Sequence, residues 1–414
     1  MTEGDATVWE YSNVRPTRAL LLENLHPLAD TVLEAQGIEI ERRSGALDEE
    51  ELITALQDFD LLGIRSKTQV TERVLRSAPH LKAIGAFCIG TNQIDLDTAR
   101  DVGVAVFNAP FSNTRSVVEL AIAEIIALTR RLTVRDKALH SGVWDKTAEG
   151  AHEVRGRTLG IVGYGNIGSQ LSVIAEALGM RVIFYDTAEK LALSNAQRAE
   201  TLDEVLTTAD VVTLHVDGRA GNAGMFGEEQ FSQMKDGSIF INLSRGFVVD
   251  LESLAQHVTS GHIAGAAVDV FPQEPKKRGE KFESVLCGLD NVILTPHVGG
   301  STEEAQENIG QFVATKLRDY LKYGATTLSV NLPNLALQAV PGSDRITHLH
   351  RNVPGVMARM NQILAEHGVN IDGQLLATEG EVGYAVTDIS SGLDAETVQK
   401  LRELDETILL RVVK

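Results

Sequence analysis

The feature that most constrains the fold is a glycine-rich segment near the middle of the chain, Gly163-Tyr164-Gly165-Asn166-Ile167-Gly168. It follows an apolar run of strand length, 159–162, and precedes a segment whose apolar residues recur at helical spacing. A second apolar run, 182–185, ends at Asp186. This order of strand, glycine turn, helix, strand and acid predicts a dinucleotide-binding unit of Rossmann type.

Each glycine of this motif has a physical task in binding a dinucleotide. Gly163 allows the tight turn, Gly165 lets the backbone approach a pyrophosphate, and Gly168 lets the helix pack closely on the strand. The N–H groups and the dipole at the helix N-terminus attract the pyrophosphate charge. Asp186 is expected to accept hydrogen bonds from ribose hydroxyls and to repel a 2′-phosphate, which favours NAD(H) over NADP(H). The alternative is a fortuitous glycine turn.

Apolar runs of strand length alternate with helical patterns from about residue 18 onward, which predicts parallel sheets with crossover helices. Turn residues at 108–113 separate a first α/β block from a second one that begins near residue 158. The spacing of Ser116 and Glu119 is that of a capping box, and it predicts a long helix that continues to about His140.

The last segment, from about residue 346, has a different order of elements. Strand and helix patterns follow one another there as βαββαβ, which is typical of a ferredoxin-like domain. The residues before it, 339–343, are predicted to form a linker.

Polar or charged residues stand at or just after the ends of the predicted strands of the second block. They are Asp186, His215, Arg245, Asp269 and His297. Ligands of open α/β sheets bind outside the carboxyl ends of the strands, so this shared position indicates a binding site.

Three residues suit the oxidation of a secondary alcohol. His297 is the candidate base for the hydroxyl proton, Glu274 is the candidate partner that orients the imidazole, and Arg245 has a planar donor fork for a substrate carboxylate. The alternatives are a structural histidine, a surface acid and an ordinary salt-bridge partner. Asp269 is expected either to bind the nicotinamide amide or to support the site. For His215, packing in the core is at least as good an interpretation.

Composition excludes several classes of protein. The chain has 38 Lys and Arg against 57 Asp and Glu, a formal net charge of −19, so we expect neither a nucleic-acid partner nor a polybasic membrane anchor. Two cysteines, Cys88 and Cys287, cannot form a disulfide framework or a four-cysteine zinc site, and we predict no metal site. Residues 1–9 show no signal-peptide pattern, and no apolar run suits a membrane span, so we expect a cytoplasmic protein.

Together, the motifs resemble those of the D-isomer-specific 2-hydroxyacid dehydrogenases, and within them the bacterial type of D-3-phosphoglycerate dehydrogenases with a C-terminal ACT domain. The resemblance extends from about residue 18 to the end. The segments that carry it are 88–95, 107–116, 163–168 with Asp186, 242–246, 268–271 with Glu274-Pro275, and 295–300.

The resemblance implies that 3-phosphoglycerate is oxidised to 3-phosphohydroxypyruvate with NAD+, the first step of serine biosynthesis. His297 would be the acid/base, Glu274 its partner and Arg245 the residue that orients the substrate. Some relatives also reduce 2-oxoglutarate to 2-hydroxyglutarate, which we keep as a second activity. The implied cofactor-binding residues are Gly163, Gly165, Asn166, Ile167, Gly168, Asp186, His215, Leu243, Ser244, Arg245, Asp269, His297, Gly299 and Gly300.

By the same resemblance, residues after a strand of the first block bind the substrate. Arg65, Ser66, Lys67 and Asn113 are expected to do so, together with Arg245. Lys67 replaces the arginine usual in the family, so it keeps the charge but loses the bidentate geometry. Without the resemblance, a solvated turn at 63–68 would be the better interpretation.

The resemblance further implies that the ACT domain binds L-serine as a feedback inhibitor through His350, Asn352 and Asn370, and that the protein is a homotetramer. The residues at the hinge are Gly342-Ser343, where the family often has two glycines, so we expect a stiffer hinge. Asp217 stands where relatives usually carry a proline, and it adds a negative charge near the adenine side of the cofactor site.

The expected architecture is a Rossmann-type NAD-binding domain inserted in a flavodoxin-like α/β substrate domain, followed by a ferredoxin-like ACT domain. The expected boundaries are 1–112 with 300–341 for the substrate domain, 113–299 for the NAD-binding domain and 342–414 for the ACT domain. Two alternatives stay open: another D-2-hydroxyacid dehydrogenase, such as one for glyoxylate or lactate, and a regulatory protein that senses NAD(H).

Overall fold

The computed structural model describes residues 15–275, 279–340, 342–390 and 393–413. The chain divides into two compact units, Met1–Pro110 with Glu307–Lys414, and Phe111–Gln306. The N-terminal residues 1–9 and Pro341 of the expected linker lie outside the described residues.

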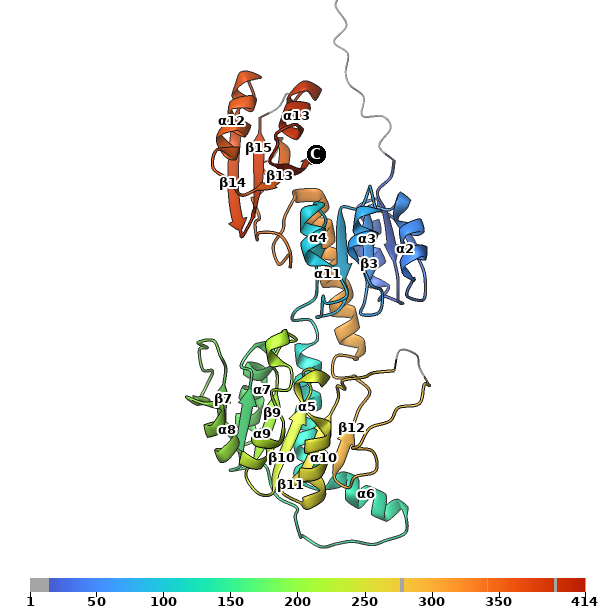
Figure 1. Ribbon diagram of the computed structural model, residues 1–414, viewed down its shortest axis with the longest axis vertical. Helices are drawn as coiled ribbons and strands as arrows, with labels where there is room; N and C mark the ends of the chain where they lie inside the picture. Colours follow the sequence, from blue (N-terminus) through green and yellow to red (C-terminus); the bar gives the residue numbers. More distant parts are fainter. Residues whose placement is uncertain (1–14, 276–278, 341, 391–392, 414) are drawn as a thin grey trace, which may run out of the picture. The chain divides into compact units, whose positions relative to one another are not determined.

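The first unit opens with a parallel five-stranded sheet of strand order β2-β1-β3-β4-β5. This is the flavodoxin-like order, which confirms the prediction for the substrate domain. This part of the chain is drawn in blue to cyan in Figure 1. The strands are β1 (Arg18–Leu21), β2 (Glu39–Arg42), β3 (Leu61–Ile64), β4 (Ala83–Ala86) and β5 (Ala105–Phe107). The helices are α1 (Leu28–Glu34), α2 (Glu49–Ala55), α3 (Glu72–Arg76) and α4 (Leu96–Asp101), with a short 3-10 turn η1 (Leu56–Asp58).

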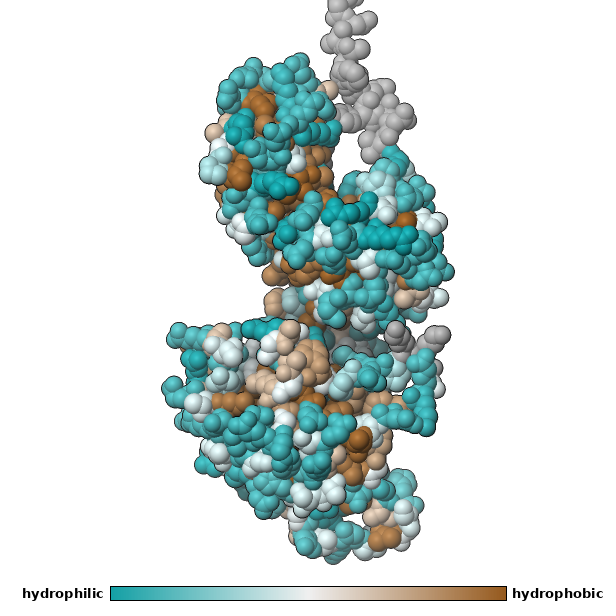
Figure 2. Space-filling model, viewed as in Figure 1, coloured by the Kyte–Doolittle hydropathy of each residue, from teal (hydrophilic) through white to brown (hydrophobic). Residues whose placement is uncertain are grey.

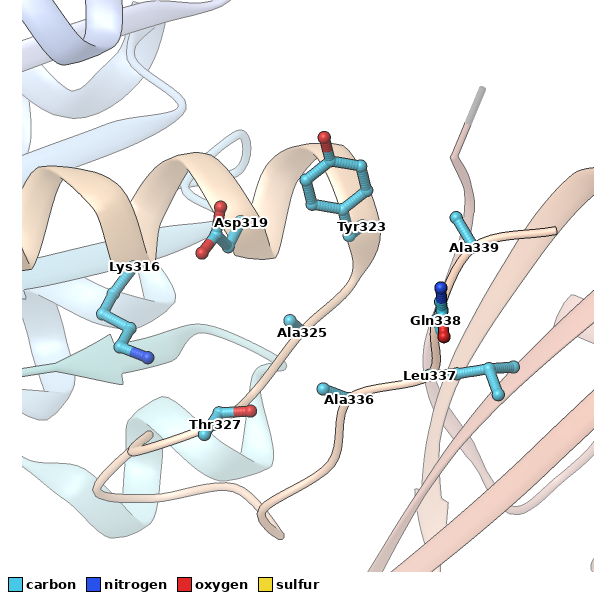
Figure 3. A pocket seen from close by; sticks show the side chains of 9 residues that line it. All are labelled: Lys316, Asp319, Tyr323, Ala325, Thr327, Ala336, Leu337, Gln338 and Ala339. Atoms are coloured by element: carbon cyan, nitrogen blue, oxygen red, sulfur yellow. The ribbon is translucent and has the colours of Figure 1, made fainter. Parts of the chain in front are cut away.

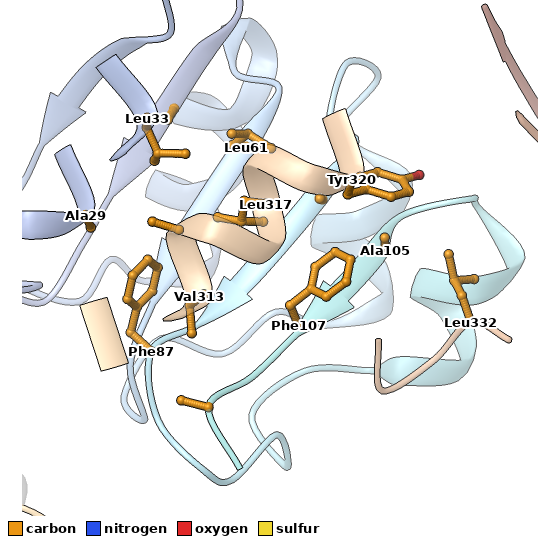
Figure 4. Packing of buried hydrophobic residues seen from close by; sticks show 14 of the residues in the cluster. Ala29, Leu33, Leu61, Phe87, Ala105, Phe107, Val313, Leu317, Tyr320 and Leu332 are labelled. Atoms are coloured by element: carbon orange, nitrogen blue, oxygen red, sulfur yellow. The ribbon is translucent and has the colours of Figure 1, made fainter. Parts of the chain in front are cut away.

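Helix α11 (Glu303–Tyr323) brings a late part of the chain back onto this sheet. Its side chains Leu317 and Tyr320 are fully buried against Phe87 and Phe107 of the sheet (Figure 4). A Cβ on Gly85 of β4 would lie 2.7 Å from a methyl carbon of Val313, so only glycine lets the helix come this close. Buried apolar clusters lie on both faces of the sheet, which explains why β1, β3, β4 and β5 are largely apolar, whereas the edge strand β2 is not.

The second unit contains a parallel seven-stranded sheet of order β12-β11-β10-β9-β6-β7-β8. The strand order reverses between β6 and β9, as in a Rossmann fold, and this confirms the predicted dinucleotide-binding architecture. The strands are β6 (Thr158–Val162), β7 (Arg181–Tyr185), β8 (Gln197–Arg198), β9 (Val211–Leu214), β10 (Ser238–Asn242), β11 (Ile263–Val268) and β12 (Val292–Leu294). The helices are α5 (Thr114–Thr129), α6 (Leu132–His140), α7 (Asn166–Ala177), α8 (Leu202–Thr208), α9 (Glu228–Gln233) and α10 (Leu251–Ser260), with 3-10 turns η2 (Ala220–Asn222) and η3 (Gly246–Val248).

The prediction of one long helix from Ser116 to His140 was wrong. The segment forms two helices, α5 and α6, because Arg131 between them adopts a left-handed conformation with φ of 53°. The predicted capping box is also absent. Helix α5 begins at Thr114, and the Ser116 hydroxyl lies 2.8 Å from the hydroxyl of Thr302.

The C-terminal part of the first unit is an antiparallel sheet of order β14-β15-β13-β16 with two helices, which confirms the ferredoxin-like prediction. One face of the sheet packs against the two helices, and the other contributes Leu349 and Tyr384 to the core around α11. The Tyr384 hydroxyl donates a hydrogen bond to the Gly324 carbonyl at the end of α11. The elements are β13 (Asp344–Arg351), α12 (Val356–Glu366), β14 (Ile371–Glu379), β15 (Val382–Ile389), α13 (Ala395–Arg402) and β16 (Thr407–Val413).

The face shown in Figure 2 is mostly hydrophilic, with hydrophobic areas between the hydrophilic ones. Large exposed apolar side chains gather at α6 and just after it: Leu132, Leu139, Val143 and Trp144. None of the helices in the described ranges is both long and apolar enough to span a bilayer.

Candidate active site

The glycine turn between β6 and α7 is shaped by close contacts on two sides. Gly163 has φ of 94°, and a Cβ there would lie 2.6 Å from the carbonyl oxygen of His215. A Cβ on Gly168 would collide with the carbonyl oxygen of Gly163. Gly165, in contrast, has no atom within 4 Å of the place a Cβ would take. The chain therefore leaves open space at the one glycine where a pyrophosphate is expected to approach.

The remaining residues of the turn divide between solvent and core. Asn166 is exposed at the start of α7, and Ile167 packs against the core of the second unit. The N–H groups at this helix start are available for an anion, because the N-cap residue Gly165 has no side chain to accept from them.

Asp186 follows β7 and holds the glycine turn from the side. One carboxylate oxygen accepts the N–H of Tyr164 at 2.8 Å, and the other accepts the N–H of Ala188 at 2.8 Å. These two contacts fix the direction of the carboxylate beside the turn. Each oxygen has a second lone pair, so the carboxylate remains able to accept from ribose hydroxyls.

Asp217 does not present an uncompensated charge near the cofactor side. Its carboxylate accepts the Arg219 guanidinium at 2.8 and 3.0 Å and the amide of Asn222 at 3.0 Å. The hydrogen bond from Arg219 is the main reason that the pKa of Asp217 is lowered. Arg219 is also close enough to Asp186 for their charges to interact.

His215, after β9, is a neutral residue rather than a proton carrier. Burial lowers its pKa to about 4. Its Nε2 lies 3.0 Å from the Thr213 hydroxyl, and its Nδ1 has no hydrogen-bond partner within the described part of the chain. These contacts favour a packing role beside the glycine turn.

Asp269, after β11, holds the loop that carries His297. One oxygen of its buried carboxylate accepts the Thr295 hydroxyl at 2.6 Å and the Val298 N–H at 2.8 Å, and the other accepts the Gly299 N–H at 2.9 Å. The backbone carbonyl of Asp269 also accepts the N–H of His297 at 2.8 Å. Of the two roles considered for Asp269, these contacts favour support of the site.

His297 and Glu274 form a hydrogen-bonded pair. Nδ1 of the imidazole lies 2.9 Å and 3.1 Å from the two carboxylate oxygens, and one of these oxygens also accepts the Phe271 N–H. The hydrogen bond with Glu274 is the main cause that raises the pKa of His297, against the effect of burial. Burial acts to raise the pKa of Glu274, but the hydrogen bonds from His297 and Phe271 outweigh it, so that pKa is lowered.

His297 itself has φ of 54°, a conformation that is uncommon for a residue with a side chain. Such a conformation persists where the surroundings hold it in place, and here the contacts with Asp269 on both sides of His297 do so.

Arg245, after β10, lies close enough to the pair for its charge to act on both members. It helps to lower the pKa of Glu274 and opposes protonation of His297. One guanidinium nitrogen donates to the carbonyl of Ser244 at 2.7 Å. Arg245, Glu274 and His297 therefore lie together within the second unit.

The Arg245 turn is held by Asn242, a residue that sequence reasoning did not single out. The fully buried Asn242 side chain donates to the Arg245 carbonyl at 3.1 Å and accepts the N–H and the hydroxyl of Ser244 at 3.0 and 2.8 Å. Leu243 is buried beside it. The sequence feature that could have indicated Asn242 is a polar residue at the end of an apolar strand.

Glu124 of α5 was also missed. It is 3% exposed, and neither carboxylate oxygen has a hydrogen-bond partner among the described residues. Burial, with a smaller contribution from the charge of Asp269, raises its pKa to about 8. The Glu124 carboxyl therefore favours its protonated form at neutral pH.

The residues expected to bind the substrate occur in both units. Arg65, Ser66 and Lys67 follow β3 in the first unit, where Arg65 is half-buried and the other two are exposed. Asn113, in the second unit, is the N-cap residue of α5, and its side-chain amide lies so close to Gly300 that a Cβ there would collide with it.

The residues expected to bind L-serine surround turns of the C-terminal sheet. His350 is buried, with Nδ1 2.8 Å from the Arg351 carbonyl and Nε2 without a partner among the described residues. The Asn352 amide donates to the Gly380 carbonyl at 3.2 Å. Asn370 donates to one oxygen of Asp372 at 3.2 Å.

The same Asp372 connects Asn370 to the hinge. Its other carboxylate oxygen accepts the hydroxyl of Ser343 at 2.8 Å, and Ser390 donates to the first one at 2.7 Å. The second hinge position thus carries a hydrogen bond that a glycine cannot make.

A groove of about 480 Å³ lies in the first unit between α11 and the segment that leads to β13 (Figure 3). Lys316 and Asp319 line one wall, and Ala336, Leu337 and Gln338 line the other. It contains none of the site residues that the sequence indicated.

Comparison with known proteins gives a consistent family assignment. Residues 122–299 match the family described as "D-isomer specific 2-hydroxyacid dehydrogenase, NAD binding domain", and residues 346–409 match "AHAS small subunit-like ACT domain". The chain is 48% identical over 395 residues to "D-3-phosphoglycerate dehydrogenase" of Haemophilus influenzae, covering 95% of this chain and 96% of the relative. It is 49% identical over 402 residues to "D-3-phosphoglycerate dehydrogenase 1" of Saccharomyces cerevisiae, covering 94% and 85%.

Solved structures agree at lower identity. A D-lactate dehydrogenase with NAD+ from Lactobacillus jensenii matches with a TM-score of 0.63 and 26% identity, covering 73% of this chain and 95% of that one.

Two glycine variants test the geometry of the turn. Gly168→Ala is expected to force the turn apart, which lowers both the Tm and the affinity for NADH, because the new methyl meets the Gly163 carbonyl. Gly165→Ala is expected to keep the wild-type Tm but to weaken NADH binding about tenfold, because its methyl enters only the open space. Thermal unfolding and fluorescence titration with NADH measure both. Wild-type NADH affinity in Gly168→Ala would contradict this account.

Proposed function

The chain belongs to the D-isomer specific 2-hydroxyacid dehydrogenases and, within them, to the D-3-phosphoglycerate dehydrogenases, and we propose that it oxidises 3-phospho-D-glycerate to 3-phosphohydroxypyruvate with NAD+. This reaction is the first step of L-serine biosynthesis. The observation that carries the proposal is the near-full-length identity of 48% to a relative of that name. The hydrogen bond between His297 and Glu274 supports the proposed chemistry.

His297 serves as the base. Because Nδ1 is held by Glu274, Nε2 is the nitrogen that takes the proton from the substrate hydroxyl. The carboxylate stabilises the imidazolium that forms, and this is the physical meaning of the raised pKa of His297. The same pair returns the proton when the reaction runs towards hydroxyacid.

Arg245 orients the substrate. Its guanidinium offers two parallel donors to the substrate carboxylate, which brings the reacting carbon to the imidazole in a defined direction. Its positive charge also opposes protonation of His297, so the free enzyme keeps more of the imidazole in the neutral form that a base requires.

The described residues fit a bound NAD. Gly165 leaves open space at the start of α7, and Asp186 keeps lone pairs for ribose hydroxyls beside the turn. The remaining contacts would come from Asn166, Ile167, His215, Leu243, Ser244, Gly299 and Gly300. When bound, NAD+ supplies the acceptor for the hydride that leaves the substrate carbon.

Arg65, Ser66, Lys67 and Asn113 supply the recognition of the phosphorylated substrate in this proposal. The chain as a whole carries a formal charge of −19, so the charge of an anionic ligand must be met by a few local groups. Those groups are Arg65, Lys67, Arg245 and the start of α7.

We further propose that L-serine binds the ACT domain at His350, Asn352 and Asn370 and inhibits the enzyme. The match of residues 346–409 to an ACT domain supports this. A cytoplasmic homotetramer is part of the same proposal, and the exposed apolar residues around Trp144 offer a face for association.

Turnover with defined substrates tests the proposed function. Purified protein with NAD+ is expected to form NADH with 3-phosphoglycerate and to be far less active with D-lactate, because D-lactate lacks the phosphate that residues 65–67 bind. Efficient turnover of D-lactate alone would favour another hydroxyacid dehydrogenase. No turnover of either would favour an NAD(H)-sensing protein.

Feedback inhibition is tested at the hinge. L-Serine at millimolar concentration is expected to inhibit the wild type. Ser343→Gly removes the hydrogen bond to Asp372, and we expect it to change the concentration of serine that halves the rate by several-fold, within the typical range of ~1–3 kcal/mol for coupling between sites. Arg402→Gln, at the exposed end of α13, is the control. An unchanged rate with serine in the wild type would refute the feedback proposal.

A further inference from the structure

The loop that follows β3 is anchored by a buried carboxylate from a neighbouring strand. Glu23 lies just after β1, which pairs directly with β3 in the sheet. One of its carboxylate oxygens accepts the N–H of Lys67 at 3.2 Å. The other accepts the N–H of Thr68 at 2.9 Å and the Thr68 hydroxyl at 2.7 Å. Three donors from two consecutive loop residues therefore meet on one side chain.

Glu23 is itself held in an unusual conformation. Glu23 and Asn24 are consecutive residues with φ of 59° and 54°, a left-handed conformation that residues with side chains seldom adopt. The Glu23 N–H donates to the carbonyl of Gly45, and the side chain is turned inward, 8% exposed. Strain of this kind is typical of positions where the surroundings demand a particular placement.

The loop is fixed from its other side as well. The carbonyl of Arg65 accepts the side-chain amide of Gln93 at 2.6 Å, and the Val70 N–H donates to the Gln93 carbonyl at 2.8 Å. Thr68 is fully buried, whereas Ser66 and Lys67 are exposed. The loop backbone is thus held at Arg65, Lys67, Thr68 and Val70, while the side chains of Ser66 and Lys67 remain exposed.

The negative charge of Glu23 would repel an anion bound at the neighbouring loop, so its presence there needs a physical reason. A packing role alone does not need a charge, since an apolar side chain could fill the same space. The carboxylate supplies acceptors on two adjacent oxygens, which is what two consecutive N–H groups and a hydroxyl require. Its use here is geometric: it fixes the backbone from which Arg65 and Lys67 project.

We propose that Glu23 is a positioning residue for the phosphate of the substrate, acting through loop 65–68. The inference rests on the proposed function, because it takes 3-phosphoglycerate as the ligand of Arg65, Ser66 and Lys67. Glu23 does not touch the reacting carbon in this proposal, so it governs binding of the substrate and not the chemical step.

The variant Glu23→Gln tests this in the full-length enzyme. The glutamine amide keeps one acceptor oxygen, but its NH2 group faces an N–H donor of the loop. That hydrogen bond is lost, and the loop is released. We expect the KM for 3-phosphoglycerate to rise about tenfold, while kcat stays within about twofold and the KM for NAD+ is unchanged. Glu39→Gln, an exposed acid of β2 in the same sheet, is the matched control and should leave all three constants as in the wild type.

Thr68 provides a second, milder pair of variants. Thr68→Val removes the hydroxyl donor and should raise the KM for 3-phosphoglycerate, whereas Thr68→Ser keeps the donor and should restore the wild-type KM. This pair decides the question if Glu23→Gln does not fold. A variant that lost structure in general would have a lower kcat and a lower Tm. Its KM for 3-phosphoglycerate would not rise selectively while the KM for NAD+ stayed unchanged.

The outcomes separate the two proposals. A wild-type enzyme that does not turn over 3-phosphoglycerate overturns the proposed function and this inference with it. An active wild type with unchanged KM in Glu23→Gln, or in both Thr68 variants where Glu23→Gln does not fold, overturns the inference and leaves the proposed function intact. A fall in kcat at unchanged KM also overturns it.

Discussion

The hydrogen bonds of the Asp269 carboxylate fix the loop that carries His297, the proposed base. Asp269 follows the buried strand β11, and its carboxylate accepts three hydrogen bonds from the loop that contains His297, at Thr295, Val298 and Gly299. These contacts hold His297 in a left-handed conformation, and in that conformation its Nδ1 reaches Glu274. The pKa of His297 is therefore a consequence of how the loop is tied to the sheet.

The same kind of contact recurs at two other loops with proposed binding roles. Glu23 fixes the loop after β3, Asp186 fixes the glycine turn, and Asp269 fixes the loop that carries His297, in each case by accepting backbone N–H groups. These acids account for part of a strongly negative composition, and each of them accepts hydrogen bonds from the loop it holds. A chain of strongly negative charge can therefore bind anionic ligands as proposed, with acids that shape the loops and a few cations as the proposed ligand contacts.

Local sequence patterns predicted what depends on local physics. The glycine turn, the alternation of strands and helices and the βαββαβ order of the C-terminal segment all follow from periodicity and turn chemistry, and the sheets have the expected strand orders. The motif also directed attention to the ends of β7, β9, β10 and β11, where the structure places the candidate residues.

Contacts between distant residues could not be predicted in this way. The break between α5 and α6 at Arg131 has no glycine or proline to announce it, and Ser116 finds Thr302 instead of its own helix. Asn242 and Glu124 look like ordinary members of a strand and a helix until the fold buries them. The hydrogen bond from Ser343 to Asp372 likewise joins residues 29 positions apart, although the replacement of a hinge glycine by Ser343 was visible in the sequence.

The most direct test of this account is the titration of His297 by NMR, with its imidazole signal assigned by comparison with His297→Gln. The account predicts a midpoint above the ordinary value of about 6.5 in the wild type, because Glu274 stabilises the protonated form, and a lower midpoint in Glu274→Gln. A wild-type midpoint at or below about 6.5, or one that Glu274→Gln leaves unchanged, would contradict it.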